Sequence, residues 1–401
     1  AVTAYLGFKP NNAEGKIMAL ASYGTPSLTA DFRKLVHLLP GGRFELDLSY
    51  FDFYLERGRR VSPKFIEQFG PPRIAESGAP DPRHLDIATA VQTVFEETLD
   101  HLLAHTHRQT ERRAVCLAGG AALNCVANGR SLPRSEFRDW YIQPAAGDNG
   151  AALGAALYVV HAIEKRPRRF VMRHDRLGPS FSDAEIAKEI SLSGVPFERP
   201  KSIAQASALL LSRGLIRAWF QDCAEFGPRS LGARSIIADV RDAGMTDKLN
   251  ARVKFREPFR PFAPAILAHR VGDYFTPAVP SPFMLFCHDV RSDRRGEVPA
   301  IVHVDGTARV QTVERDVNPL FYELIEAFDK ETGVPIILNT SFNIRGEPIV
   351  NSLKDALKCY LTTDIDFLAI GGYLLWKPKP VCTEAIAAVR ASVGFHDSAN
   401  R

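Results

Sequence analysis

The stretch "RRAVCLAGGAALNCVANGR", Arg112 to Arg130, decides the fold class. Its apolar run is typical of a buried strand, and the pair Gly119 and Gly120 then forms a tight turn that opens a helix. Residues 139–144 read as a second strand, and 147–165 as a helix with small residues on one face. Just upstream, apolar residues recur at helical spacing over 84–110. The order helix, strand, helix, strand, helix predicts an α/β layered fold.

The rest of the chain continues this alternation. We expect helices over 202–214, 318–333 and 352–363, and strands over 215–220, 261–268, 282–290, 307–313, 334–342 and 366–377. A basic, proline-containing connector over 165–183 is the best domain boundary. We therefore predict a first domain at 1–170, a linker at 171–183 and a second α/β domain at 184–401.

Composition limits the classes of function. A chain of 401 residues suits two domains that each bury a core. The net charge of +4 and the lack of like-charge blocks argue against a nucleic-acid tail or a membrane-surface arm. Six scattered cysteines without paired spacing indicate reduced thiols and a cytoplasmic protein. No apolar run approaches the roughly 18 residues that a membrane span needs.

The glycine pair is the first candidate for chemistry. A helix starting at Gly119 and Gly120 would aim free N–H groups at an anion such as a nucleotide phosphate, although a simple turn explains the glycines equally well. Asn124, four residues on, fits a ribose or phosphate contact or a helix cap. Asp148 precedes another glycine-rich helix start, where a carboxylate caps the helix or ligates a metal.

A second constellation is cationic. Eight basic residues fall between positions 229 and 260, against four acids: Arg229, Arg234, Arg241, Lys248, Arg252, Lys254, Arg256 and Arg260. Several lie beside glycine, proline or phenylalanine, as in "KFREPFRPFAP", so their positions are stiff and suited to a phosphate or carboxylate. The alternative is a structural network of ion pairs.

Two later segments fit an anion pocket. Arg309 lies on a strand entered through a tight turn, and Asn339, Ser341 and Asn343 end another strand, where hydroxyl and amide donors complete an oxyanion cradle. The sequence leaves open whether Arg234 is a second phosphate contact or braces Arg229 through a carboxylate.

Seven segments in order resemble the O-carbamoyltransferase family that includes the nodulation-factor, cephamycin and nebramycin (tobramycin) carbamoyltransferases. They are "YLGFKPNNAEGKIMALASYG", "LAGGAALNCVANG", "GDNGAALGAA", "EFGPRSLGARSIIAD", "VKFREPFRPFAP", "HVDGTARVQ" and "LNTSFNIRGEPIV". The resemblance implies the C-terminal part of an actin-like (Kae1-like) ATPase domain, followed by a YrdC-like α/β domain.

The resemblance also implies a two-step reaction. Carbamoyl phosphate loses phosphate and reacts with ATP to give carbamoyl adenylate and pyrophosphate, and the carbamoyl group then passes to a hydroxyl of a natural product such as an aminoglycoside. ATP and a divalent metal ion would be the cofactors, with iron favoured over magnesium, zinc or manganese. We expect no nucleic-acid partner and no membrane association, while the sequence leaves the acceptor and the oligomeric state open.

Site residues follow by position in the matching motifs. Six would hold carbamoyl phosphate and the adenylate: Arg229, Lys254, Arg260, Arg309, Asn339 and Ser341. Five would contact the nucleotide: Glu14, Lys16, Gly119, Gly120 and Asn124. Asp148 would be a metal ligand, because it stands where the Kae1-like "DNGA" aspartate does.

The start of the chain departs from the family pattern. The metal-binding histidines and the lobe that carries them lie upstream of the first motif, so we expect an N-terminal portion to be absent. Two other functions remain as alternatives. One is a tRNA threonylcarbamoylation enzyme built from the same two domain types, and the other is an actin-like nucleotide-dependent binding module without group transfer.

Overall fold

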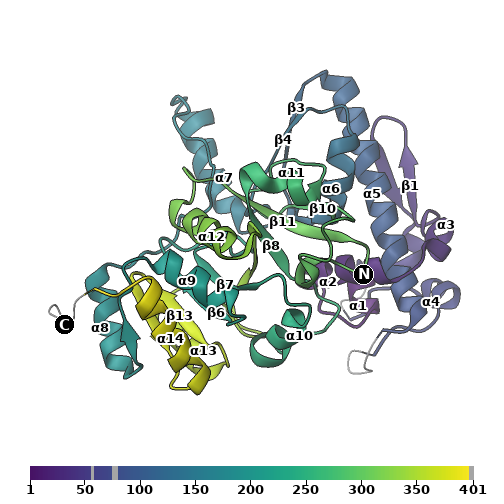
Figure 1. Cartoon of the computed structure of the whole chain (residues 1–401). Helices are drawn as coiled ribbons and strands as arrows, with labels where there is room; N and C mark the ends of the chain where they lie inside the picture. The colour runs from purple at the N-terminus through teal and green to yellow at the C-terminus, as the bar shows by residue number, and fades with distance from the viewer. Residues whose placement is uncertain (56–57, 75–79, 397–401) are drawn as a thin grey trace. The chain divides into compact units, whose positions relative to one another are not determined.

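The computed structural model describes residues 1–55, 58–74 and 80–396 (Figure 1). The chain forms two compact units. The first contains residues 1–117, 124–142 and 303–305, and the second contains 118–123, 143–302 and the chain from Gly306 onward. Both combine helices and strands, which confirms the α/β class. The domain boundaries predicted at 170 and 184 stay predictions.

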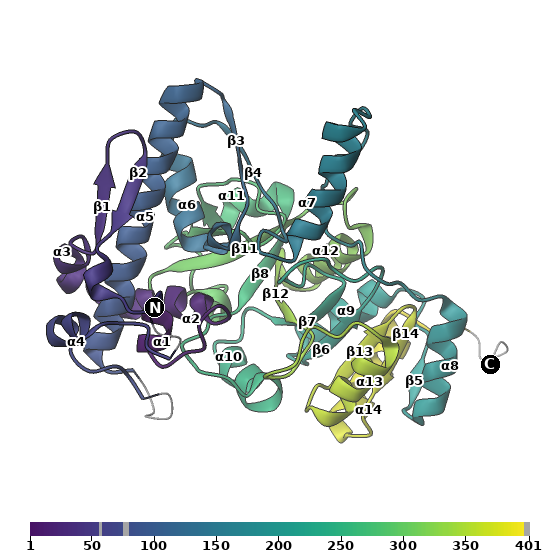
Figure 2. The same cartoon turned by 180° about the vertical axis from the view of Figure 1, so that it is seen from behind.

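The long helix α5, Pro82–Thr110, is the backbone of the first unit. It begins where the Asp81 side chain accepts a hydrogen bond from the His84 N–H at 3.0 Å, with Pro82 in the first turn, and this confirms the helix predicted over 84–110. Figure 2 shows the hairpin β1–β2 beside α5. The smaller elements of this unit are α1 Val2–Tyr5, α2 Glu14–Leu20, α3 Thr29–Phe32, β1 Val36–Leu39, β2 Arg43–Leu46 and α4 Pro63–Phe69.

The predicted strand–turn–helix–strand sequence is present. Strands β3, Ala114–Leu117, and β4, Asp139–Ile142, pair in parallel, and α6, Cys125–Arg134, lies between them in the chain. Two details are wrong. The strand β3 was expected to be buried, but none of its four residues is. In addition, α6 does not start at the glycine pair but at Cys125, after a 3₁₀ turn over Gly120–Leu123. The amide of Asn124 caps the helix, so the helix N-terminus belongs to Asn124 and not to the glycines.

A ten-stranded mixed sheet forms the second unit. Its order is β5-β14-β13-β6-β7-β12-β8-β11-β10-β9, with the pairs β13/β6 and β8/β11 parallel and all others antiparallel. The strands are β5 Phe197–Glu198, β6 Arg217–Phe220, β7 Arg234–Asp239, β8 Ala263–Leu267, β9 Phe275–Thr276, β10 Phe286–Val290, β11 Thr307–Val313, β12 Ile336–Ser341, β13 Phe367–Ile370 and β14 Tyr373–Trp376.

Helices cover this sheet. Figure 1 shows α9 and α12 side by side, and they pack on β7, β8 and β12. Strands β6, β7, β8 and β13 are buried at every residue. This explains the apolar runs of β8 and β13, whereas β6 and β7 also bury the polar residues Arg217, Arg234, Ser235 and Asp239. The helices are α7 Gly150–Tyr158, α8 Asp183–Ser193, α9 Ile203–Ser212, α10 Met245–Leu249, α11 Val271–Tyr274, α12 Pro319–Thr332, α13 Leu353–Thr362 and α14 Pro380–Ser392.

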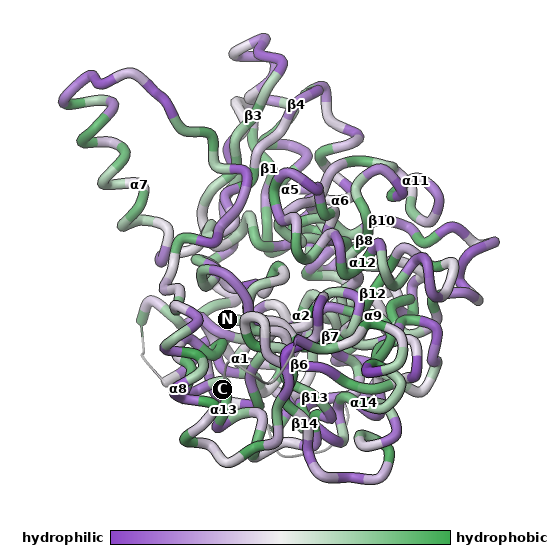
Figure 3. The backbone as a smooth tube through the Cα atoms, turned by 60° about the vertical axis from the view of Figure 1, so that its left-hand side comes forward, coloured by the Kyte–Doolittle hydropathy of each residue, from purple (hydrophilic) through white to green (hydrophobic). Residues whose placement is uncertain are grey.

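Three further observations refine the sequence predictions. The single strand expected over 366–377 is a hairpin of β13 and β14, because Gly371, at a φ of 53°, turns the chain. Within the predicted linker, Asp175 is 1% exposed and its carbonyl accepts a hydrogen bond from the Phe226 N–H. Helix α7 is apolar, as Figure 3 shows, and none of its residues is buried.

All six cysteines are free thiols, and four of them are buried, in agreement with the prediction of reduced cysteines. Of the other two, Cys116 is exposed and Cys223 is partly buried. In the ranges that the structure describes, no helix has the length and apolar character needed to cross a membrane.

Candidate functional site

Several cations in the basic segment from 229 to 260 form close ion pairs with carboxylates. Arg241 pairs with Asp239 at 2.7 Å, and Lys248 pairs with Asp242 at 2.6 Å. A third cation, Arg252, donates to two carboxylates, Asp364 at 2.7 Å and Asp366 at 2.6 Å. For these three residues, the ion-pair alternative is the correct one.

Arg234 is also structural. It is fully buried, and its guanidinium donates to four backbone carbonyls, those of Gln221, Asp222, Ala233 and Pro179. The guanidinium also stacks on the ring of Phe220 at 3.6 Å. Burial lowers the pKa of Arg234 to about 10. Both roles left open by the sequence are therefore wrong: the arginine neither faces an anion nor reaches a carboxylate with its side chain.

Glu225 shapes the loop that carries Arg229. Its Oε1 accepts hydrogen bonds from the N–H groups of Leu231 at 2.7 Å and Ala233 at 2.8 Å, and its Oε2 accepts from the N–H of Arg234 at 3.1 Å. Burial raises the pKa of this carboxyl. The sequence predicted no role for Glu225, although this residue is the first of the motif "EFGPRSLGAR".

Lys254 is the most unusual cation. Its side chain is buried, with 4% of the residue exposed. Its Nζ donates hydrogen bonds to the carbonyl oxygen of Ser341 and, at 3.2 Å, to the Oγ of the same residue. It also donates to Asn343 Oδ1 at 2.9 Å. Among the described residues, no carboxylate lies at ion-pair distance from it. Burial and the charges of Arg256 and Arg260 hold the pKa of Lys254 well below its usual range.

Several arginines lie near the Lys254 ammonium or near one another. Burial and the nearby charges of Arg260 and Arg309 lower the pKa of Arg256 to about 9. The pKa of Arg260 is lowered by burial, and Arg309 and Arg345 also lower it, while Glu257, 3.8 Å away, opposes them. We call the following five residues the cationic cluster: Lys254, Arg256, Arg260, Arg309 and Arg345. The lowered pKa values of Lys254, Arg256 and Arg260 are those expected of cations gathered at a site for an anion.

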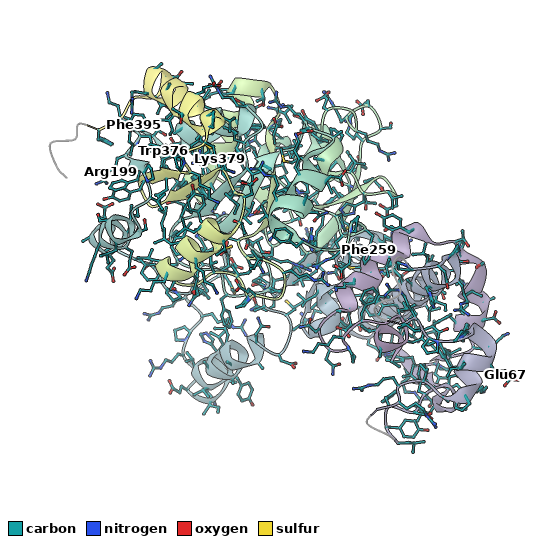
Figure 4. The ribbon with its side chains drawn as sticks, turned by 90° about the horizontal axis from the view of Figure 1, so that it is seen from below. Glu67, Arg199, Phe259, Trp376, Lys379 and Phe395 are labelled. Atoms are coloured by element: carbon teal, nitrogen blue, oxygen red, sulfur yellow. The ribbon has the colours of Figure 1, made fainter. Side chains whose placement is uncertain are left out.

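The cluster lies away from the β5–β14 edge of the sheet. Figure 4 labels Phe259, the chain neighbour of Arg260, and shows it apart from Arg199, Trp376 and Phe395, which lie around that edge. Arg256 stacks on the ring of Phe262 at 4.3 Å, which fixes its guanidinium. The short sequence 254–262 thus supplies both the charges and the aromatic support.

Strand register brings the later predicted residues to this place. Asn339 pairs with Ala263, and Gln311 with Ala265, so their side chains share one face of β12, β8 and β11. Ser341 lies two residues after Asn339 on β12, and Arg309 lies two residues before Gln311 on β11. Because side chains alternate between the two faces of a strand, both lie on this same face. The structure therefore unites Ser341, Arg309 and Lys254, which the sequence places far apart.

Arg229 lies at the same face. It is half-buried, and the two residues after it are fastened to the sheet: Asn339 Nδ2 donates to the Ser230 carbonyl at 3.2 Å, and Gln311 Nε2 donates to the Leu231 carbonyl at 2.9 Å. In addition, Asn339 Nδ2 donates to Gln311 Oε1 at 2.8 Å. Asn339 thus braces the loop, a role that the sequence did not indicate.

Besides Glu225, sequence reasoning missed two residues of this site and left the role of a third open. Arg345 lies within the quoted motif "LNTSFNIRGEP", and Gln311 stands two residues after Arg309 on a strand, where alternation already places both on one face. Arg256 was noted as a cation without a role. The strand periodicity was the signal for Gln311.

The residues predicted to contact a nucleotide divide between the two units. Glu14, Lys16 and Asn124 belong to the first, and Gly119 and Gly120 to the second. The Oδ1 of Asn124 accepts a hydrogen bond from the Ala127 N–H, and its Nδ2 donates to Gln92 Oε1 at 2.9 Å. The Gly119 N–H donates to the Ala146 carbonyl at 2.8 Å. Nucleotide binding by these five residues stays a prediction.

Asp148 does not cap a helix. Helix α7 starts at Gly150 with Asn149 at its N-cap, and no side chain provides the cap. Asp148 is exposed, and no group of three or more His, Cys, Asp or Glu side chains suited to a metal occurs in the described part of the chain. These residues alone therefore do not make a complete metal site, and the assignment of Asp148 as a ligand stays a prediction.

Comparisons with known proteins agree with the layout of the chain. A family model described as the carbamoyltransferase N-terminus matches residues 1–157, and one described as the carbamoyltransferase C-terminus matches residues 208–377. The second match contains the whole cationic cluster.

Two relatives come from nodulating bacteria. The chain is 38% identical to nodulation protein NolO of Bradyrhizobium diazoefficiens, over 97% of this chain and 70% of that protein. It is 39% identical to nodulation protein NolNO of Sinorhizobium fredii, over 93% of this chain and 54% of that protein. The chain thus spans between about half and seven tenths of the length of these relatives.

The chain was also compared with a solved structure of full-length HypF in its phosphate- and nucleotide-bound form. The aligned region is 42% of this chain and 21% of the HypF chain, with 18% sequence identity and a TM-score of 0.28. This similarity is too low to support an argument about the fold.

Proposed function

This chain belongs to the carbamoyltransferase family of enzymes, and from that premise we propose that it serves the ATP-dependent transfer of a carbamoyl group from carbamoyl phosphate to a hydroxyl group of a small natural product. Its partners in the reaction would be a carbamoyl donor and a hydroxylated acceptor.

The cationic cluster is the observation that carries the proposal. A buried ammonium with no carboxylate partner among the described residues is unfavourable by itself, and the charges of Arg256 and Arg260 lower its pKa further. A phosphate dianion supplies the missing negative charge. Rigid guanidinium groups bind phosphate oxygens in a fixed geometry, and burial strengthens the attraction because the local dielectric is low.

The residues suggest how the donor is handled. Lys254, Ser341 and Arg309 would hold the phosphate of carbamoyl phosphate, and Arg229, on its braced loop, would add a further contact. Water would attack the carbonyl carbon, and as the bond from this carbon to the phosphate oxygen breaks, carbamate forms and the negative charge on the leaving phosphate is stabilised by donors that are already in place. ATP would supply the adenylyl group that turns carbamate, a poor carbamoyl donor, into a mixed anhydride, with release of pyrophosphate.

We extend the proposal to the finer assignments that the family resemblance implies. They are an actin-like first domain that binds the nucleotide and a metal ion, a YrdC-like second domain that performs adenylation, a cytoplasmic location and an acceptor of the antibiotic type such as an aminoglycoside. In the described residues, Asp148 lacks partners for a metal, so no step is assigned to a metal here.

The test is to mix the protein with ATP and carbamoyl phosphate and to measure pyrophosphate, followed by mass spectrometry of a panel of hydroxylated antibiotics. We expect pyrophosphate only when both substrates are present, and a mass gain of one carbamoyl group on one acceptor. Arg229→Ala and Lys254→Ala should abolish pyrophosphate release. Release with bicarbonate and threonine in place of carbamoyl phosphate, or binding of nucleotide without any release, would overturn the proposal.

A further inference from the structure

A short segment ahead of α8 is fastened to the loop that carries Arg229. We call residues 173–179 the strap and residues 222–231 the Arg229 loop, and the two run antiparallel beside each other. Three backbone hydrogen bonds join them: the N–H of Phe226 donates to the carbonyl of Asp175 at 2.6 Å, that of Gly178 to the carbonyl of Ala224 at 2.9 Å, and that of Ala224 to the carbonyl of Pro179 at 2.9 Å. The strap therefore fixes the course of the chain just before Arg229.

Arg176 joins the strap to two further segments. Its side chain is 10% exposed, its Nε donates to Asp222 Oδ2 at 2.8 Å, and its Nη2 donates to the carbonyl of Val317. Asp222 begins the Arg229 loop, and Val317 lies in the turn that follows β11. A guanidinium is planar and presents its N–H groups in a fixed geometry. One side chain thus sets the distance between the start of the loop and the end of β11.

Strand β11 also holds the other end of the loop. Gln311, on this strand, donates to the carbonyl of Leu231 at 2.9 Å. Arg229 therefore lies between two attachments, one to the strap and one to β11. Because Arg176 reaches Val317, it ties the first attachment to the same stretch of chain that provides the second.

The Arg229 loop also approaches the strap closely. A Cβ added to Gly227 would lie 3.5 Å from Asp175 Oδ2 and 3.3 Å from the carbonyl oxygen of Pro144. Asp175 itself is 1% exposed. The chain thus has little room to move toward the strap at the glycine that lies two residues before Arg229.

Fixed attachments of this kind affect how tightly an arginine binds an anion. A loop that is already in its binding conformation loses less conformational entropy when the ligand binds. When the loop also samples other conformations, the apparent affinity falls by the fraction of molecules that are competent to bind. A residue that does not touch the ligand can therefore set the affinity of one that does.

We propose that Arg176 is a positioning residue of the phosphate site: by joining Asp222 to the carbonyl of Val317, it holds the Arg229 loop in the conformation that binds the phosphate of the donor. Arg176 lies outside all seven segments that carry the family resemblance. The inference rests on the proposed function, since it requires that Arg229 contact the phosphate.

The test is a double-mutant cycle in which calorimetry measures the affinity for inorganic phosphate. Arg176→Met should weaken binding about 3- to 10-fold, as expected when the loop is competent in about a tenth to a third of the molecules. In the Arg229→Met background, the same substitution should change the affinity by less than about twofold, because no guanidinium remains to be positioned. A general loss of folded protein would weaken binding equally in both backgrounds.

Two further variants serve as comparisons. Arg176→Lys keeps the charge and one of the two hydrogen bonds, so it should restore part of the affinity that Arg176→Met loses. Arg199→Met is the matched control, because Arg199 also donates to a carboxylate, that of Asp183 at 3.2 Å, and stacks on the ring of Tyr373 at 4.6 Å. Arg199 lies near the β5–β14 edge, apart from Phe259 (Figure 4), and its loss should leave the phosphate affinity unchanged.

Hydrogen exchange followed by mass spectrometry measures the loop without any ligand. Peptides that cover residues 222–231 should exchange faster in Arg176→Met than in wild type or Arg199→Met, while peptides of α14 should exchange at the wild-type rate. This measurement decides the question where Arg229→Met binds phosphate too weakly for calorimetry.

The outcomes separate this inference from the proposed function. If Arg176→Met keeps the wild-type affinity, loses equal affinity in both backgrounds, or leaves exchange over 222–231 unchanged, the positioning role is wrong and the proposed function stands. An affinity of Arg176→Lys no higher than that of Arg176→Met would also contradict the role. If wild type binds neither inorganic phosphate nor carbamoyl phosphate, the proposed function is wrong and the inference is wrong with it.

Discussion

The guanidinium carbon of Arg234 lies 3.6 Å from the centre of the Phe220 ring, which places this arginine inside the fold. Only five residues earlier in the chain, Arg229 is half-buried beside the sheet face that carries Ser341 and Arg309. Two arginines of one short loop thus lie in different surroundings, and we propose that Arg234 serves packing and Arg229 ligand binding.

Their variants should separate accordingly. Arg234→Met leaves four backbone carbonyls without their donor, and we expect the free energy of unfolding to fall by about 3 kcal/mol or more. Arg229→Met should change it by less than about 1 kcal/mol but weaken inorganic phosphate binding about 10-fold or more. Urea unfolding and calorimetry measure the two effects. Equal losses of stability in both variants would contradict the division.

Phosphate binding should be coupled to protonation of Lys254. Burial and the neighbouring arginines lower the pKa of its ammonium, and a bound dianion opposes that shift and raises the pKa again. We therefore expect proton uptake on phosphate binding at alkaline pH, and an affinity that decreases as the pH rises. Calorimetry in buffers of different ionisation enthalpy measures the uptake.

Lys254→Met provides the comparison for that experiment. The variant should bind phosphate more weakly and without the proton uptake assigned to the lysine. Undiminished uptake in Lys254→Met would show that another group takes the proton.

Two arginines four residues apart should respond in opposite ways. Arg252 neutralises the buried Asp366, which is 2% exposed, so Arg252→Met leaves that carboxylate alone and should cost about 3–5 kcal/mol of stability. Arg256→Met removes one of several repelling cations, so stability should stay within about 1 kcal/mol of wild type while phosphate affinity falls. Thermal unfolding with and without phosphate distinguishes the two. A large phosphate-independent loss in Arg256→Met would assign that residue to the structural network.

Asp175 should make stability depend on pH. Burial, and then the charge of Glu225, raise the pKa of Asp175 from 3.8 to about 8. Since the folded state holds this proton more tightly than the unfolded state, the stabilisation is complete below about pH 4 and decreases as the pH rises to 8, with a slope of up to about 1.4 kcal/mol per pH unit. Other groups near Asp175 are His174, Arg176 and Asp222.

The isosteric variant isolates this effect. Asp175→Asn mimics the protonated acid, so its free energy of unfolding, measured with urea between pH 5 and 8, should vary less with pH than that of wild type. Parallel pH profiles for the two proteins would show that Asp175 is ionised in the folded state.

Much of the second unit was predictable from local pattern. The strands at 217–220, 263–267 and 307–313 and the helix at 319–332 lie where the apolar periodicity predicted them, because a buried strand or an amphipathic helix leaves its period in the sequence. The hairpin at Gly371 was missed, since a short apolar run with two glycines reads as one strand. The start of α6 was misplaced because Asn124, not the glycine turn, provides the cap.

The sequence by itself determined the α/β class, the family and the identity of most cations at the candidate site, because ordered motifs and local periodicity are properties of neighbouring residues. Tertiary structure alone decided which cations are paired with carboxylates. Asp364 and Asp366 lie more than a hundred residues from Arg252 and neutralise it, whereas no described carboxylate reaches Lys254. Charge pairing depends on distance in space, and strand register, which brings Gln311 to Asn339 across β8, sets those distances.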